Sequence, residues 1–413
     1  PRLAKLRRNK KGIGVAQLII QIFAFFFDGT SRHLTYFDHL KTDTGYAAVL
    51  ETDPDALASS HQVKRFFAKF PKVFAGAFRL VLRRMFTHRL AIQRPATVSL
   101  FLDTMVLDND DAEQREGVQP TYKKVKGFQP LQLIWNGQII DAQFRGGSKN
   151  GNHDQTAWIM IEQAVKLIEK TLGRDVPVVV RIDGGFFDGS LFRRMDEYGI
   201  GFVCSGRLSP FVKAFAAEQT SETTWESYTN GKQAWSYFEF GFRCKSWKRF
   251  YRALYLKPRY DGEQMLLEFA RPEGVILTNL GSDPYLFTHA DPALREQLFS
   301  AENLIGEHHR KGGDELTHRA LKDFGFEQMP FQSYGANAAF YYFMVIAFNV
   351  MGWYKEDVLV EMGLVGKGSY ATTIRRGGDR LRGQDREDGQ VRRAEGDQVD
   401  HVAGEAGRAL ATM

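Results

Sequence analysis

The chain has 413 residues, of which 43% are apolar and 25% charged, as in a folded globular protein. This length exceeds one ordinary hydrophobic core and predicts two or three domains. A net charge of +6 suits a polyanionic partner, and two widely spaced cysteines, Cys204 and Cys244, argue against a disulfide framework or a structural zinc site. We therefore expect a reducing, cytoplasmic location.

The first 90 residues are predicted to be helical. In "SHQVKRFFAKF" and "FAGAFRLVLRRMFTHRL", Phe and Leu recur at helical spacing among Arg and Lys, and six basic residues occur between positions 2 and 11. A basic helical domain fits DNA binding, and a helical bundle with basic surfaces is the equally weighted alternative.

Two apolar segments, 14–27 and 338–354, are shorter than the ~20 residues that a membrane-spanning helix needs. We interpret both as core helices and expect no membrane association.

The next part of the chain predicts an α/β layer with a mixed sheet. Segment 97–107 has the composition of a buried strand, and 130–145 has two strand-like runs around an Asn-Gly pair, a strong hairpin signal. Segment 157–173 repeats apolar residues at helical spacing, and 176–187 predicts a central strand buried on both faces.

The pattern then changes twice. Aromatic and polar residues alternate from about 211 to 290, which predicts an antiparallel β insertion, and a helical pattern returns from Asp291 to Lys355. Beyond Tyr370 the chain has no aromatic residue and many Gly, a composition for which we expect disorder.

Two aspartates, Asp103 and Asp183, occupy strand positions suited to metal-dependent chemistry. Two carboxylates on neighbouring strands and a third on a later helix can hold two divalent ions about 4 Å apart, which activate the attacking oxygen and stabilise the leaving oxygen at a phosphodiester. Asp183 precedes two glycines in a tight turn, where helix capping is the competing role. Asp103 has an alternative role as a solvated strand-end acid, with rival carboxylates nearby: Asp108, Asp110 and Asp111.

The segment 308–322, "HHRKGGDELTHRALK", offers a third acid. His308, Lys311 and Lys322 stand at offsets of −7, −4 and +7 from Glu315, which fall on one face of a helix. A solvated helix face with i, i+4 ion pairs is the alternative for this stretch read alone. Because Gly is unfavourable inside helices, the two glycines after Lys311 predict a helix that begins near Asp314.

These four residues resemble the Tyr-x2-Arg-x3-Glu-x6-Lys signature of one branch of the DDE-type transposases of bacterial insertion sequences, with His in place of Tyr and Lys in place of Arg. "LFLDTMV" looks like the first-acid strand of this family, "VRIDGGFFDGSLFRRMDEYGIGFV" resembles its second-acid strand with the following helix and strand, and "FGFEQMPFQSYGANAAFYYFMVIAFNV" resembles its closing helices. The resemblance covers roughly residues 30–356 and is greatest to the branch numbered thirteen-eighty.

The resemblance implies an RNase H-like α/β core split by a β-rich insertion, with an N-terminal helical domain. The implied organisation is a DNA-binding domain at 1–90, the first part of the core at 91–210, the insertion at 211–290, closing core helices at 291–356, and a disordered or frameshifted tail at 357–413.

The resemblance also implies the chemistry. Asp103, Asp183 and Glu315 would be catalytic and would hold Mg²⁺, with Mn²⁺ as a substitute, while contacts to DNA phosphate would come from His308, Lys311 and Lys322. Its substrates would be double-stranded DNA: the terminal inverted repeats of a bacterial element and a target. The enzyme would act as a homodimer in a synaptic complex, in the cytoplasm at the nucleoid.

Two other functions stay open at this point: a catalytically impaired DNA-binding relic or regulator of the same fold, and a nuclease that cuts without strand transfer. Glu302 and Glu307 are fallback choices for the third acid. Trp225, Trp235 and Trp247 either stack on an unpaired base or pack inside the β layer, and packing is favoured.

Overall fold

A computed structural model describes residues 12–376 except 113, 150, 152, 220–223, 232 and 260–272. The chain divides into two compact units, Pro1–Trp353 and Tyr354–Met413. The basic segment 2–11 and residues 377–413, most of the predicted tail, lie outside the described residues. The described part of the second unit contains the π-helix η9 (Lys355–Val360) and a helical segment at 371–376.

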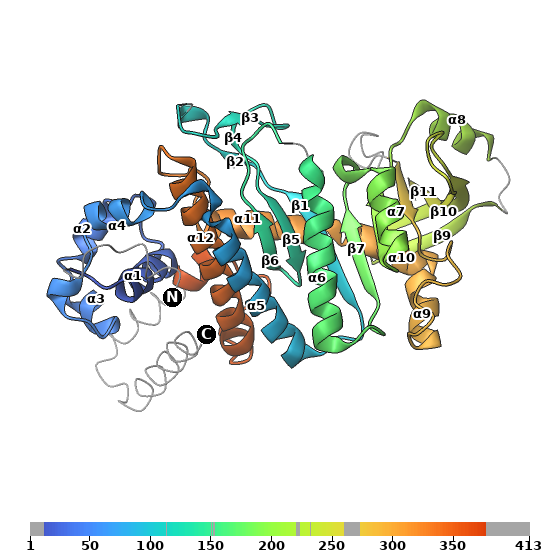
Figure 1. The fold of residues 1–413 in the computed structure, drawn as a ribbon. Coiled ribbons are helices and arrows are strands. Elements are labelled where there is room, and N and C mark those ends of the chain that lie inside the picture. The colour runs from blue at the N-terminus through green and yellow to red at the C-terminus, as the bar shows by residue number, and fades with distance from the viewer. Residues whose placement is uncertain are drawn as a thin grey trace. The chain divides into compact units, whose positions relative to one another are not determined.

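A mixed sheet organises the first unit (Figure 1). Among the described residues it has nine strands, of which β1, β7 and β8 are parallel neighbours and the other adjacent pairs are antiparallel, as the sequence predicted for a mixed sheet. In spatial order the strands are β6 (Gln138–Gln143), β5 (Leu131–Trp135), β1 (Val98–Thr104), β7 (Val178–Ile182), β8 (Gly201–Ser205), β12 (Gly274–Thr278), β11 (Tyr251–Arg259), β10 (Gln233–Phe242) and β9 (Glu226–Asn230).

The antiparallel strands β9 to β12 come from the segment predicted as a β insertion. They do not form a separate layer, because β12 pairs with β8 and so continues the central sheet. The tryptophans of this region have packing partners: Trp225 lies 4.8 Å from the Phe238 ring, Trp235 4.5 Å from His309, and Trp247 5.3 Å from Phe187. These contacts favour the packing interpretation.

The predicted hairpin is formed by β5 and β6. Asn136 and Gly137 have φ values of 48° and 75°, as a two-residue type I′ turn requires. The outer edge of β6 is covered by α12 (Tyr334–Tyr354), whose Asn349 side chain accepts from the Ile139 N–H at 3.0 Å and donates to the Ile139 carbonyl at 2.9 Å. This amide pair satisfies backbone groups that a bare edge strand would expose.

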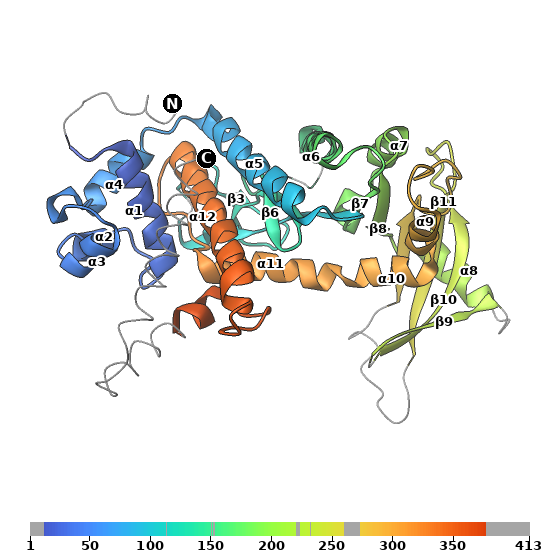
Figure 2. The ribbon, with the colours of Figure 1, turned by 90° about the horizontal axis from the view of Figure 1, so that it is seen from below.

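Helices cover both faces of the sheet. In Figure 2, α5 (Ala75–Gln93), α6 (Thr156–Leu172) and α7 (Gly189–Glu197) lie on one side, and α10 (Ala301–His309) and α11 (Lys311–Phe324) run end to end along the other. Only Arg310 separates α10 from α11. The prediction that the second helix begins near Asp314 was therefore wrong. A helix that follows α10 almost directly needs little new nucleation, which offsets the cost of two exposed glycines.

The N-terminal helices pack on α12 through aromatic rings. Phe23 of α1 lies 5.6 Å from Phe343, Phe67 of α4 lies 5.6 Å from Phe340, and the Phe78 ring of α5 stacks on Tyr342 at 5.3 Å. A capping box between Ser59 and Gln62 begins α4. The helices here are α1 (Val15–Asp28), α2 (Tyr36–Leu40), α3 (Thr44–Val49) and α4 (Ser60–Phe67), with the 3-10 turns η2 (Pro54–Ala56) and η3 (Lys72–Phe74).

The helical segment Tyr334–Val360 has the length and apolar composition that a membrane-spanning helix needs, within the part of the chain described here. The expectation that it would be too short was wrong. However, 78% of its apolar window is buried inside the protein, as expected for a core helix.

The remaining elements are short. A second sheet has the order β2 (Leu107–Asp108), β4 (Lys126–Phe128), β3 (Gln119–Pro120), and the other elements are η4 (Asp110–Ala112), η5 (His153–Gln155), η6 (Gly184–Phe186), α8 (Pro210–Glu218) and α9 (Pro292–Phe299).

Candidate active site

The alternation of side chains along β1 and β7 determines which face carries the candidate acids. Leu100 and Leu102, with Val180 and Ile182, belong to the core beneath α6, so the alternate positions Ser99, Phe101 and Asp103 face the other side. Parallel pairing places Leu102 opposite Ile182, and the next residues are Asp103 and Asp183. The two aspartates therefore occupy adjacent positions on strands about 4.8 Å apart.

The candidate third acid, Glu315, lies on α11, which follows α10 on that same face. Leu304 and Ile305 of α10 pack against Val179 of β7, and Glu307 pairs with Arg181 of the same strand at 3.4 Å. In α11, which continues α10, the His318 ring lies 6.4 Å from that of Phe101. Glu315 is one turn earlier on α11 and is exposed.

Tyr122 lies near all three candidate acids. Burial of its hydroxyl, together with the charges of Asp103, Asp183 and Glu315, raises the pKa of Tyr122 to about 12, and a hydrogen bond from Thr104 opposes this rise. One phenol thus lies within the field of all three carboxylates. The tyrosine itself belongs to the turn between β3 and β4.

Asp103 is held by two neighbours. Its Oδ1 accepts from the Thr104 N–H at 2.6 Å, and its Oδ2 lies 3.8 Å from Nδ1 of His318. Only 9% of Asp103 is exposed. Asp183 is more open: its Oδ1 accepts from the Gly185 N–H at 2.8 Å, which is the capping role weighed above, whereas its Oδ2 makes no hydrogen bond to any described residue.

The predicted phosphate-binding residues take different positions. His308 Nε2 is 3.1 Å from the Ser205 hydroxyl at the end of β8. The preceding residue, Cys204, lies opposite Ile182 of β7. His308 is therefore beside the strand end that carries Asp183. Lys322 lies on α11 and pairs with Glu327. The backbone of Lys311 begins α11, and its side chain is outside the described residues.

The fallback and rival acids have structural partners. Glu307 is 7% exposed and accepts from Ser99 at 2.9 Å and Arg310 at 2.5 Å, in addition to its pair with Arg181. The Asp108 carboxylate accepts from the Asp110 N–H at 2.9 Å, and the Asp110 carboxylate accepts from the Lys126 N–H at 3.0 Å. Asp111 accepts from the Gln328 side chain, and Glu302 is exposed on α10.

The donor set suits a hard divalent cation. Within the described ranges, no three His, Cys, Asp or Glu side chains are grouped closely enough to make a complete metal site. Mg²⁺, however, commonly takes only one or two carboxylates together with waters and substrate phosphates. Asp103 and the open oxygen of Asp183, at neighbouring strand ends, fit such a shared site, and Glu315 of α11 is the candidate third ligand.

Two residues that the sequence reasoning missed belong to this site. His318 is only three residues after Glu315, which places it on the same side of a helix, and that spacing is a usable signal. Tyr122 gives no such signal, because it comes from a turn whose position depends on the packing of the small sheet.

Burial strongly perturbs His318. Desolvation, helped by the charges of Lys322 and Lys123, lowers its pKa to about 4. The folded state therefore favours neutral imidazole, so stability is full above pH 6.5 and falls as the pH drops toward 4, by up to about 3 kcal/mol. Urea unfolding between pH 7 and 4 is expected to show this slope, and His318→Asn is expected to flatten it. If His318→Asn kept the same pH dependence of stability, His318 would not be its source.

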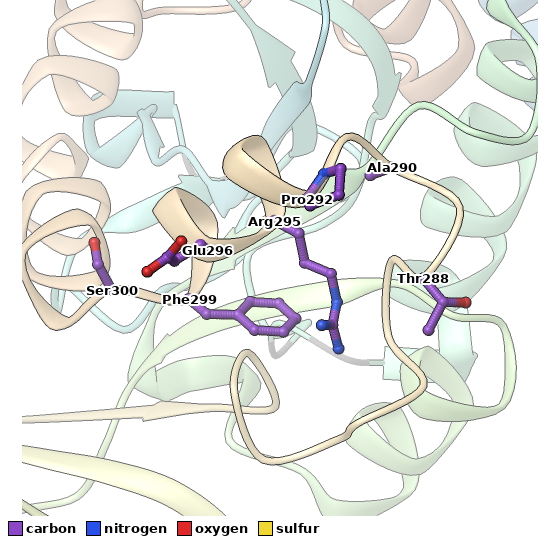
Figure 3. Close-up of a pocket in the computed structure, with 7 residues that line it drawn as sticks. All are labelled: Thr288, Ala290, Pro292, Arg295, Glu296, Phe299 and Ser300. Carbon is purple, nitrogen blue, oxygen red and sulfur yellow. The ribbon is translucent and has the colours of Figure 1, made fainter.

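A pocket elsewhere is lined by none of these residues (Figure 3). It lies beside α9, and its lining consists of Thr288, Ala290, Pro292, Arg295, Glu296, Phe299 and Ser300.

The comparisons with known proteins identify the family. No curated protein matches the chain. Among solved structures, the chain is similar to one described as a cryo-EM structure of the piggyBac transposase synaptic complex with hairpin DNA, at 10% identity and a TM-score of 0.45, over 90% of this chain and 74% of that one. The family model described as "Transposase DDE domain group 1" matches residues 13–372, most of the chain. The chain therefore belongs to the transposases of DDE domain group 1.

Proposed function

We propose that this transposase cleaves DNA at the terminal inverted repeats of a bacterial insertion sequence and joins the freed 3′ ends to target DNA. Its catalytic residues in this proposal are Asp103, Asp183 and Glu315, on an RNase H-like core. The observation that carries the proposal is the register of Asp103 and Asp183 at neighbouring strand ends, on the face that α11 crosses with Glu315. The charges of all three acids act on Tyr122, which supports this arrangement. The spacing of His308, Lys311, Glu315 and Lys322 supports the branch with the Tyr-x2-Arg-x3-Glu-x6-Lys signature, numbered thirteen-eighty.

Asp103 and Asp183 would hold Mg²⁺ or Mn²⁺ together with Glu315. When bound, such a cation stabilises charge on phosphodiester oxygens and makes a coordinated water or hydroxyl a stronger nucleophile. Asp103 is fixed by Thr104 and by neutral His318, so its carboxylate has a set orientation. Glu315 is exposed and has a longer side chain, which lets it close on the site when DNA phosphate arrives.

His308 and Lys322 would position DNA phosphate near the acids, and Lys311 at the start of α11 would add a further cation. Such contacts fix the register of the DNA without reading its sequence. The basic N-terminal helical region would bind the inverted repeat, and two copies of the chain would bring two ends together.

The test is a cleavage and joining assay with the full chain and a labelled duplex that carries the inverted repeat flanking its coding sequence. With Mg²⁺ or Mn²⁺ we expect nicked duplex and products joined to a plasmid target, and with EDTA neither product. Joined products that form in EDTA would overturn the metal assignment.

A DNA-binding relic or regulator is the second candidate, because His308 and Lys311 replace the Tyr and Arg of the signature. Lys offers a point charge in place of the bidentate guanidinium. Specific binding of the repeat without cleavage in either metal would establish this function, and cleavage without joining would indicate a nuclease.

A further inference from the structure

We propose that Tyr122 is a stacking platform for a base at the DNA end on which the three acids act. This inference rests on the proposed cleavage of DNA, which it deepens by naming a residue that contacts the substrate. Tyr122 is a large aromatic residue, yet it is 61% exposed. The charges of the buried Asp103, the half-buried Asp183 and the exposed Glu315 all act on it. Every base has a π-face, so an exposed ring at this place binds a DNA end without regard to its sequence.

The turn that carries Tyr122 is held firmly. The carbonyl of Val125 accepts from both the N–H and the hydroxyl of Thr121, at 2.9 and 2.8 Å, and the Lys124 N–H donates to the Thr121 carbonyl at 3.1 Å. Thr121 is buried, and Lys124 has the left-handed φ of 63° that closes the turn. The ring is therefore presented by a fixed support, which lowers the entropy lost when a base stacks on it.

Close backbone packing anchors this turn to the sheet. A Cβ on Gly127 of β4 would stand 2.0 Å from the Leu107 carbonyl, and one on Gly147 would stand 2.1 Å from the Gln119 carbonyl. Gly127 therefore lets β4 approach β2 within the small sheet, and Gly147 lets the segment after β6 approach β3. Because β2 follows β1 after only Met105 and Val106, the small sheet that carries the turn is joined closely to the strand that bears Asp103.

The charges around the ring suit a DNA end. The Lys123 ammonium lies 5.9 Å from the centre of the Tyr122 ring, and its charge also acts on His318 beside Asp103. A phosphate next to a stacked base would meet this ammonium, which offsets the repulsion from the three carboxylates. The Thr104 hydrogen bond holds the phenol oxygen at the acid side of the turn.

The experiment uses the full chain, Ca²⁺ in place of Mg²⁺, and a pre-cleaved inverted-repeat duplex with 2-aminopurine at each of its last three positions in turn. Wild type and Tyr122→Phe are expected to quench the fluorescence at one position. Tyr122→Leu is expected to leave it unquenched and to weaken binding about 10-fold, within the range for a lost base–aromatic stack.

Tyr285→Leu is the matched control, because it makes the same change in a tyrosine that is 84% exposed and is expected to behave as wild type. Quenching that survives in Tyr122→Leu would overturn the stacking role. Equal losses of quenching and binding in Tyr122→Phe and Tyr122→Leu would also overturn it, because they would assign the effect to the phenol oxygen. Wild type that binds no repeat duplex would overturn the proposed function and the stacking role together. Wild type that binds and quenches, beside a Tyr122→Leu variant that does the same, would overturn only the stacking role.

Discussion

Glu315→Gln is expected to reduce metal-dependent cleavage of the inverted-repeat duplex on the order of 10²- to 10³-fold, the size found when one stabiliser of transition-state charge is removed. The amide keeps the shape of the side chain and loses its charge. Because Glu315 is exposed on α11, the fold and the affinity for DNA should stay close to those of the wild type. Single-turnover cleavage at saturating protein, with binding measured separately, separates the chemical step from association.

Glu302→Gln provides the matched control. Glu302 is also an exposed glutamate on a helix of the same face, one that precedes α11, and its variant should cleave at the wild-type rate. Cleavage that survives in Glu315→Gln would refute its assignment as third acid. Glu307 is a poor replacement, since its carboxylate already serves Ser99, Arg181 and Arg310.

Asp141→Ala should lower the free energy of unfolding by about 3–5 kcal/mol, the usual loss when one partner of a buried ion pair is removed. Asp141 is 2% exposed on β6, and it accepts from Arg79 at 2.7 and 2.8 Å and from Arg83 at 2.8 and 3.1 Å. Both arginines belong to α5, so this carboxylate joins the helix to the edge of the sheet. Its removal leaves two poorly solvated guanidinium groups without that carboxylate.

Urea unfolding of the wild type and of both Asp141→Ala and Asp55→Ala would measure the effect. Asp55 is exposed in η2, and its replacement should change stability by no more than about 0.5 kcal/mol. A loss below about 1 kcal/mol in Asp141→Ala would show that α5 relaxes and hydrates its arginines, in conflict with the buried pair.

Local patterns predicted several elements well. The Asn-Gly pair specified the turn between β5 and β6, because few other residues accept left-handed backbone at both positions. The apolar run before Asp183 became β7, and the periodic segment 157–173 became α6, ending at Gly173 with a φ of 104°. These signals depend on neighbouring residues alone.

Predictions that depended on longer-range packing were less successful. Glycine propensity predicted a late start for α11, whereas the helix begins at Lys311, directly after α10. The segment 211–290 formed the predicted antiparallel strands β9 to β12, but its start folded as α8 (Pro210–Glu218), where strands had been predicted. The start of α11 shows how a preceding helix changes the outcome, because a helix that follows α10 almost directly needs little new nucleation and tolerates the cost of two glycines.

By itself the sequence determined the type and order of the main elements, placed Asp103 and Asp183 on strands, and gave the helical spacing around Glu315. Only the tertiary structure decided that the two aspartates are register neighbours on one face, that α11 crosses this face, and that His318 and Tyr122 join them. The physical reason is that hydrophobic periodicity and turn chemistry act over a few residues. The meeting of side chains more than a hundred residues apart depends on strand register and on how helices pack across the sheet.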